Sequence, residues 1–456
     1  AVPTAADNAI VAAHTVTINA VGQAINNLTV QGSLEFGPTP TTFNVNGNLN
    51  VEVGGEFLVF NGTTGKALVV SGNIVNDGSI DLSVGATTNG SAVQSITGSG
   101  AFANNVIRNL TFSNTSVAIP NINWGFDNIS VAYNLNITNA KINLNNNKII
   151  FGIGSAVAAD TGNTFTITNG GFLNGTFSRW WTAGQTGYTT SGPTAIPTGT
   201  AGRYPFYTPS GDQRIFYLGR TTPTVGGKYA VTYNNATTNT TGLSIVDGAY
   251  TITNRWDGNF VVTLDGTAPV AASNWVTLFT PGAFVTTATG ARVLGQNAPL
   301  SGTHVNTSNA PYGQRSGVLT ADLISGTGLY LGVNAADVPF VSANSGDWNV
   351  GSTWNTGTVP SCTDVVFIAS GHTVTSTTSG NVVRNLTISS GGTLVVSAGD
   401  LTVGCTLNNN TLTNNGTLTV SGGLLAVNGN MVHNASSTFN QSGGDILVDG
   451  NEGGVA

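Results

Sequence analysis

One phrase of this sequence occurs near both ends of the chain, and that repetition constrains the fold more than any other feature. Residues 2–7 (VPTAAD) return as 359–364 (VPSCTD), and further matches follow in the same order. The further matches are 10–17 with 367–375 and 27–30 with 385–388. Ordered matches at a nearly constant offset predict that one structural unit is present twice in the chain.

Short segments with alternating apolar residues recur between these landmarks, each bounded by Gly, Asn or Asp. Examples are 33–36 (SLEF), 47–51 (GNLNV), 392–396 (GTLVV) and 416–420 (GTLTV). Closely spaced strands of this length fit a sandwich, a barrel or a solenoid. The segments resemble one another, as stacked coils must, and this favours a solenoid. Each coil is expected to turn its apolar side chains inward and to lie about 4.8 Å from the next coil. We expect Asn at the corners, where it tolerates left-handed φ and can stack on the Asn of adjacent coils.

The composition agrees with an all-β protein and excludes several kinds of partner. Charged residues make up only 7% of the chain while Gly numbers 61, and no dozen residues show helical periodicity with a charged face. No apolar run approaches the roughly 20 residues of a membrane-spanning helix. A net charge of −7 argues against nucleic acid and against a polybasic membrane-surface patch. We therefore expect neither nucleic-acid binding nor membrane insertion.

The middle of the chain differs from both ends. Aromatic residues and most of the arginines concentrate there, and the alternating segments lengthen, as in 228–233 (KYAVTY) and 259–264 (NFVVTL). Such strands with long loops are typical of an antiparallel β-sandwich. The predicted organisation is a parallel β-solenoid arm over 1–176, an antiparallel β-sandwich over 177–336, and a second solenoid arm over 337–456.

The opening of the second copy resembles a known module. Trp348-Asn349-Val350-Gly351-Ser352-Thr353-Trp354, followed by 359–360, 364–368 and 371–375, is similar to the start of solenoid modules in giant surface proteins of Bacteroidota. Those proteins use the type IX secretion system, and the phrase also resembles the extracellular G8 domain. Residues 128–150 resemble later coils of these modules, and 175–206 the lead-in to the sandwich that often follows them. The resemblance implies a secreted, cell-surface adhesin or fibre component for attachment or gliding motility.

The first copy lacks the two tryptophans and enters the motif at Val2. We therefore expect that its opening has been cut away and that the unit belongs to a longer tandem array. Cut solenoid ends expose strand edges, so neighbouring repeats, other subunits or caps are the expected partners there.

The two cysteines of the chain, Cys362 and Cys405, both belong to the second copy. Their counterparts in the first copy are Ala5 and, roughly, Val53. Two thiols that are present together in one copy and absent together from the other predict a disulfide, which would fit an oxidising extracellular setting. The alternative is that both are small buried apolar residues.

Four residues of the middle region are candidates for ligand binding. Trp256 and Asp257 lie in Asn254-Arg255-Trp256-Asp257-Gly258, which fits a glycan platform or, with Asp265-Gly266, a calcium loop. The alternative is a core tryptophan beside an Asp-Gly turn. Trp180 and Trp181 are adjacent, so in a strand one of them must face outward and is the better candidate for a ligand or an interface.

No catalytic residues or cofactor are expected. The histidines show no metal-ligand spacing, His14 and His372 occupy equivalent repeat positions, and the acidic residues are scattered. Calcium is the one ion the sequence leaves open. The favoured function is a structural or adhesive module, the alternative is carbohydrate binding through the Trp-rich region, and a polysaccharide-degrading enzyme is less favoured.

Overall fold

The computed structural model describes residues 3–20, 22–38, 42–59, 67–153, 164–187, 200–279, 291–305, 312–405 and 410–449. These residues are almost entirely strand and turn, so the all-β prediction is confirmed. Their only α-helix is α1 (Thr320–Leu323), and two 3-10 turns are η1 (Ala335–Asp337) and η2 (Gly351–Thr353). The chain divides into two compact units, of which the first ends at Gly332 and the second begins at Val333.

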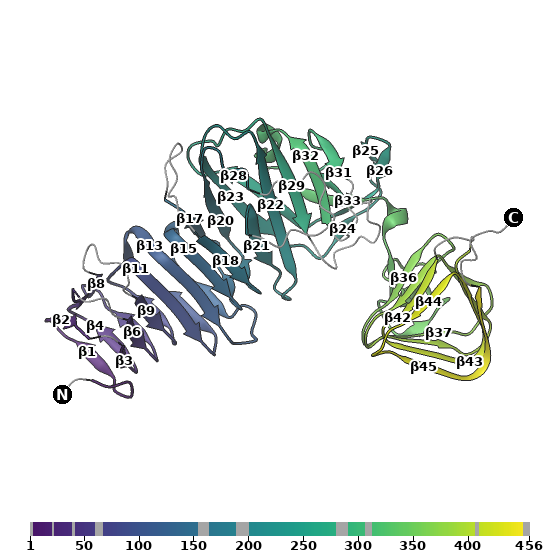
Figure 1. Cartoon of the computed structure of the whole chain (residues 1–456), viewed down its shortest axis with the longest axis horizontal. Coiled ribbons are helices and arrows are strands. Elements are labelled where there is room, and N and C mark those ends of the chain that lie inside the picture. Colours follow the sequence, from purple (N-terminus) through teal and green to yellow (C-terminus); the bar gives the residue numbers. More distant parts are fainter. Residues whose placement is uncertain are drawn as a thin grey trace. The chain divides into compact units, whose positions relative to one another are not determined.

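The first unit opens with a β-solenoid of stacked parallel coils (Figure 1). One sheet stacks β1 (Ala9–Val11), β4 (Leu28–Val30), β7 (Leu49–Val51), β10 (Ile74–Asn76), β12 (Gln94–Thr97), β14 (Ile122–Trp124), β16 (Lys141–Asn143) and β19 (Gly171–Leu173). A second stacks β2 (Thr15–Ile18), β5 (Ser33–Phe36), β8 (Glu56–Val59), β11 (Ser79–Gly90), β13 (Ala101–Asn114), β15 (Ile129–Thr138), β17 (Lys148–Phe151) and β20 (Thr176–Trp181). The third side of the coil is formed by β3 (Gln23–Ile25), β6 (Thr42–Val45), β9 (Ala67–Val70) and β18 (Thr164–Thr168), which join the long strands β11 and β15.

The solenoid core consists of apolar columns that run from coil to coil. Leu28 pairs in register with Leu49, Leu49 with Ile74, Ile74 with Ile96, and Ile96 with Trp124, and all five side chains are buried. Because successive side chains of a strand alternate between its two faces, each short strand contributes every second residue to such a column. The period-two pattern of the sequence is thus the pattern of this core.

A ladder of asparagines binds one coil to the next at a corner. The side-chain oxygen of Asn27 accepts the backbone N–H of Asn48 at 2.7 Å, and that of Asn48 accepts the N–H of Asn73 at 2.8 Å. Asn73 in turn accepts the N–H of Ser95 at 2.8 Å. Other asparagines, including Asn128 and Asn145, adopt positive φ in turns of the coils, a conformation that asparagine tolerates better than most residues.

After β20 the two sheets of the solenoid continue into a region of mostly antiparallel strands, in which β21 still pairs in parallel with β19. The first sheet continues through β21 (Arg203–Tyr207), β22 (Gln213–Thr221), β29 (Ser273–Phe279), β32 (Tyr312–Val318) and β31 (Thr303–Val305), and the second through β23 (Gly227–Asn234) and β28 (Asn259–Leu264). A four-stranded sheet contains β24 (Asn239–Thr240), β27 (Asn254–Trp256), β33 (Tyr330–Val333) and β30 (Arg292–Leu294), and β25 (Ile245–Asp247) forms a hairpin with β26 (Tyr250–Ile252).

The boundary predicted at residues 176/177 is therefore not a break between compact units. One edge of β20 pairs in parallel with β17, and its other edge pairs antiparallel with β23. Since a single strand belongs to both regions, the coils and the antiparallel region share one continuous core.

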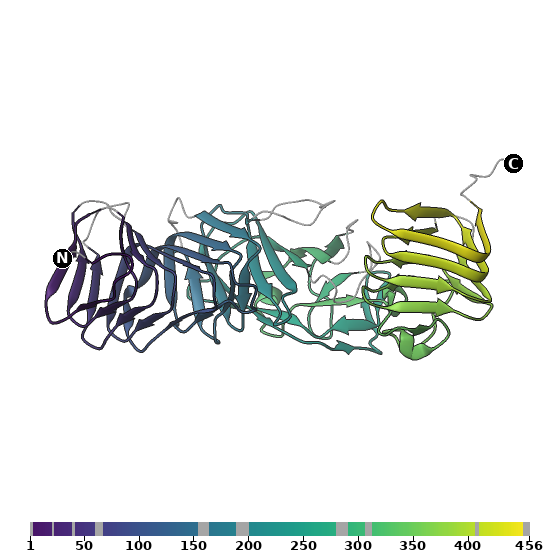
Figure 2. The same cartoon turned by 90° about the horizontal axis from the view of Figure 1, so that it is seen from below.

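The second unit is again built from stacked parallel coils (Figure 2). Its first sheet stacks β34 (Phe340–Val341), β36 (Val365–Ile368), β39 (Asn385–Ile388), β42 (Thr411–Asn414) and β44 (Asn430–His433). Its second sheet stacks β35 (Gly346–Asp347), β37 (Thr373–Ser376), β40 (Thr393–Val396), β43 (Thr417–Asn428) and β45 (Thr438–Asp449), with β38 (Asn381–Val383) and β41 (Asp400–Val403) joined to the long strand β43. Leucine and valine columns fill its core.

The sequence repeat is also a structural repeat, down to individual hydrogen bonds. The Asp7 carboxylate accepts the N–H and hydroxyl of Thr4, and Asp364 accepts the same two groups of Ser361. The side-chain oxygen of Asn385 accepts the N–H of Thr411 at 2.8 Å, as Asn27 does for the following coil of the first unit. The two copies of the phrase therefore form the same coil corner in both units.

Candidate functional site

Trp181, one of the predicted ligand residues, is buried in the first unit. It is 1% exposed, and its indole N–H donates to the hydroxyl of Tyr204 at 2.9 Å. The guanidinium groups of Arg179 and Arg220 lie 5.8 and 5.7 Å from its ring centre. Trp181 therefore offers no open ring face on which a sugar could stack.

The two arginines beside Trp181 hold the junction together. Arg179 donates to the carbonyl oxygens of Thr200 and Arg203 at 2.9 and 2.8 Å, and Arg220 donates to those of Val225 and Val270. Burial lowers the pKa of Arg179 and raises that of Tyr204. No sequence pattern indicates this role, because the partners of both arginines are main-chain carbonyls.

Trp180 is the tryptophan of this pair that faces outward, and it is half-buried. The Lys228 ammonium lies 5.5 Å from its ring centre. Lys228 also forms an ion pair with Asp265 at 3.2 Å, and Lys148, from the last coils of the solenoid, pairs with the same carboxylate at 3.1 Å. Burial alone would raise the pKa of Asp265, but the hydrogen bond from Lys148 and the charge of Lys228 outweigh burial and lower that pKa. Two lysines thus neutralise Asp265, the acidic residue of the Asp265-Gly266 pair for which the sequence left calcium open.

Trp256 lies in the core, and the Asp257 carboxylate beside it is hydrogen-bonded by neighbouring side chains. Trp256 is only 8% exposed, in agreement with the alternative of a core tryptophan beside a turn. The Asp257 carboxylate accepts the hydroxyls of Thr238 and Thr240 at 2.8 and 2.5 Å and lies 3.4 Å from the Arg255 guanidinium. Burial would raise the pKa of Asp257, but these hydroxyls and the arginine outweigh it and lower the pKa. The Asp257 carboxylate is thus held by two hydroxyls and a guanidinium of the chain itself.

A second buried ion cluster lies in the antiparallel region and was not predicted. The Asp247 carboxylate lies 2.9 Å from Arg315 Nη1 and 3.6 Å from Arg292 Nε. Arg315 also donates to the carbonyl oxygens of Leu300 and Ser301 at 2.7 and 2.9 Å. Burial, and then the charge of Arg292, lowers the pKa of the neighbouring His304 to about 4. The cluster ties β25 to β30 and β32 and has the geometry of a structural crosslink.

Several further histidines and acidic residues contact neighbouring segments of the coils. His372 Nδ1 lies 3.0 Å from the Ser342 hydroxyl, whereas the equivalent His14 is exposed. Glu35 accepts the Thr17 hydroxyl and Glu52 the Gln31 amide, each from the neighbouring coil. Within the described ranges, no three His, Cys, Asp or Glu side chains cluster closely enough to hold a metal ion.

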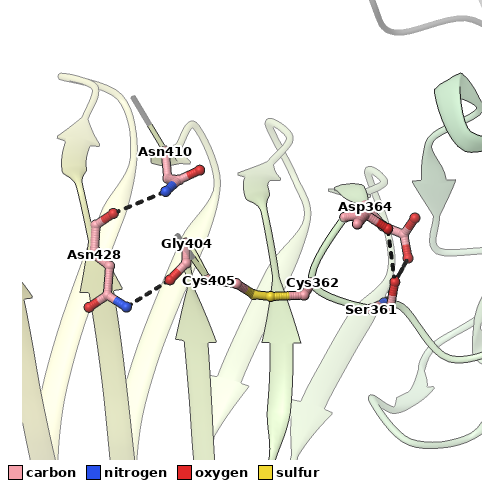
Figure 3. Close-up of a disulfide and its surroundings, with 8 residues drawn as sticks. Ser361, Cys362, Asp364, Gly404, Cys405, Asn410 and Asn428 are labelled. Atoms are coloured by element: carbon pink, nitrogen blue, oxygen red, sulfur yellow. Dashed lines mark hydrogen bonds between the residues drawn. A yellow bond between two sulfur atoms is a disulfide. The ribbon is translucent and has the colours of Figure 1, made fainter. Parts of the chain in front are cut away.

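A disulfide joins Cys362 and Cys405 in the second unit, with a Cα–Cα distance of 5.6 Å (Figure 3). It connects the turn before β36 to the residue that follows β41 and Gly404. The strand registers show that the counterpart of Cys405 is Gly47 rather than Val53, because Val45 and Val403 occupy equivalent positions. A Cβ atom on Gly47 would lie 2.3 Å from the side-chain oxygen of Asn27, so this position of the first unit has no room for a cysteine.

A hollow with a mainly apolar lining lies at the first coil of the first unit. It has a volume of about 310 Å³, and no charged side chain lines it. Its lining includes Val11, Val16, Ile18, Leu28, Leu34 and Phe43. These residues belong to the core columns of the coils, so the hollow is the open end of the solenoid core.

No family model, curated protein or solved structure matches the chain. Among the described residues, no helix is long and apolar enough to cross a membrane.

Proposed function

We propose that this chain is a structural spacer module of a secreted, cell-surface fibre or adhesin. The observation that carries the proposal is that polar side chains along the coils form hydrogen bonds to the neighbouring coil. The asparagine ladder and the Glu35 and Glu52 contacts bind one coil to the next instead of converging on a cleft. Parallel strands stacked in this way form a stiff rod that lengthens by about 4.8 Å per coil.

In this proposal the antiparallel region is a β-sandwich carried between two solenoid arms. The disulfide between Cys362 and Cys405 supports an extracellular location, since such bonds persist in oxidising compartments. The partners are neighbouring repeats or other subunits that meet the solenoid ends. The Bacteroidota surface proteins that the opening phrase resembles have the same kind of role.

A replacement experiment in the producing cells tests the spacer role. Replacing the coils that precede β13 by unrelated coils of equal number, with β13 to β20 kept because β20 is shared with the antiparallel region, should preserve surface display and attachment, because a spacer acts through its length. A replacement with half the number of coils should weaken attachment while surface display remains. Loss of attachment with the replacement of equal length would contradict the proposal, since the chain's own surface would then be required.

Carbohydrate binding is the second candidate, and Trp180 is the observation that favours it. Of the three tryptophans predicted to bind a ligand, Trp180 alone is more than marginally exposed. A glycan array should then show binding that Trp180→Ala removes. Trp275→Ala is the matched control, because Trp275 is also half-buried in the antiparallel region. Equal loss in both variants, or no binding by the parent protein, argues against this candidate.

Polysaccharide cleavage has less support, and a viscosity assay on acidic and neutral glycans tests it directly.

A further inference from the structure

The first coil of the first unit exposes a face that its counterpart in the second unit buries. Among the described residues, β1 and β2 stand at the ends of their sheets, with no strand on their outer edges. Val16 of β2 is 43% exposed and lines the apolar hollow. Its repeat equivalent Val374 is 0% exposed. The same coil is therefore open in one unit and closed in the other.

Residues 340–358 close the coil in the second unit. β34 and β35 add parallel strands to the outer edges of β36 and β37. Trp348 and Trp354, which are 0% and 2% exposed, pack over the end of the core with ring centres 5.0 Å apart. The indole N–H of Trp354 donates to the carbonyl oxygen of Trp348 at 2.8 Å and fixes the pair. This segment is a cap made of two short strands and two tryptophans.

The groups that receive this cap have equivalents in the first unit. The N–H of Ser342 donates to the carbonyl oxygen of Phe367 at 2.9 Å, and that of Trp348 donates to the carbonyl oxygen of Thr375 at 2.8 Å. The repeat alignment places Ile10 and Thr17 at the positions of Phe367 and Thr375. The corners of the two coils share their hydrogen bonds, as the Asp7 and Asp364 turns show, so the same edge is presented in both units.

We propose that the open face formed by β1, β2 and the hollow between them is a docking site for a tryptophan-bearing capping segment. Its occupant adds two parallel strands to β1 and β2 and inserts aromatic side chains over Val16, as residues 340–358 do over Val374. The lining carries no charged side chain and so favours an apolar partner over an ionic one, and the outer edges of β1 and β2, which no described strand pairs, fit a polypeptide. The inference deepens the proposed spacer function, because it names the chemistry by which one module receives the next.

The test adds a second copy of residues 339–358 directly before Val2 in the full chain. This join reproduces the natural one, since Thr358 precedes Val359 and Val359 is equivalent to Val2. Hydrogen exchange at the amides of β1 and β2 should slow by about 100-fold, the effect expected from burying tryptophan side chains over a fraying end. Binding of an apolar dye to the open face should fall in parallel.

Two variants of the extended chain act as controls. One carries alanine in place of both added tryptophans, and the other carries Val16→Asp, which places a charge where the cap would pack. Both should exchange as fast as the parent chain. If the extended chain does not fold, the peptide 339–358 added in trans to the parent chain should give the same protection at saturation.

Three outcomes would overturn the proposal. Unchanged exchange in a folded extended chain shows that the face does not accept the cap. Equal protection with and without the tryptophans shows that packing is not the cause. Protection of β1 and β2 in the parent chain that rises with protein concentration identifies a second copy as the occupant instead. Each outcome leaves the replacement test of the spacer role unaffected.

Discussion

Removing the disulfide should destabilise the second unit by a predictable amount and leave the first unit unchanged. The bond closes a loop with a sequence separation of 43 residues, from the turn before β36 to the end of β41. Both cysteines are half-buried, so replacing them with serine removes little packing. In the chain-entropy account, releasing a loop of this length frees the unfolded chain and costs about 4 kcal/mol of stability.

Native-state hydrogen exchange at increasing urea concentration measures this cost for each unit separately. Amides of Leu386 and Leu394 report on the second unit, and those of the equivalent Leu28 and Leu34 report on the first. With a urea dependence of about 2 kcal/mol per molar, the unfolding midpoint of the second unit should fall by about 2 M in C362S/C405S. Reducing the parent protein under native conditions should give the same shift.

The first unit is the internal control, because its equivalent positions are Ala5 and Gly47 and carry no bond. Its midpoint should not move in C362S/C405S. A loss below about 1 kcal/mol in the second unit would refute the reasoning from loop closure. An equal loss in both units would refute their independence.

Three further predictions concern packing and charge. In urea unfolding, Val374→Ala should lower the free energy of unfolding by about 2 kcal/mol and Val16→Ala by less than about 0.5 kcal/mol, because only Val374 is covered. Equal losses would contradict the difference between the two coils. Asp247→Asn should lower the free energy of unfolding by about 3–5 kcal/mol in thermal unfolding, since it leaves Arg315 buried without its counter-charge. A loss below about 1 kcal/mol would show that the cluster is not structural. Because the pKa of Asp265 is lowered, its contribution to stability is complete above its unfolded pKa of about 3.9 and is lost as the pH falls through the folded pKa. Asp265→Asn should therefore flatten the acid limb of the stability profile. An unchanged limb would exclude Asp265 as the source of that pH dependence.

The solenoid could be predicted from sequence because its signals are local. Period-two apolar residues, glycines and asparagines at corners, and the repeated phrase each follow from the geometry of one coil. The Asp7 and Asp364 turns are an example, since each needs only a hydroxyl residue three positions earlier. The register between the two copies is less well predicted from sequence. The repeat alignment pairs Cys405 with Val53 instead of Gly47, because the loops between the strands differ in length.

Which of the candidate tryptophans is open to solvent could not be predicted, for a physical reason. Alternation indicates that Trp180 and Trp181 face opposite ways, but it does not show which face the rest of the chain covers. The antiparallel strands that bury Trp181 come from residues far along the sequence. Buried arginines such as Arg220 leave no pattern either, since a main-chain carbonyl can accept from any neighbour.

The shared strand β20 has a mechanical consequence. Its parallel pairing with β17 spans 176–179 and its antiparallel pairing with β23 spans the whole strand, so the first unit has no hinge between its coils and its antiparallel region. A load or a twist applied to the coils passes directly through the hydrogen bonds of this strand. The orientation of any surface on the antiparallel strands is therefore fixed relative to the axis of the coils.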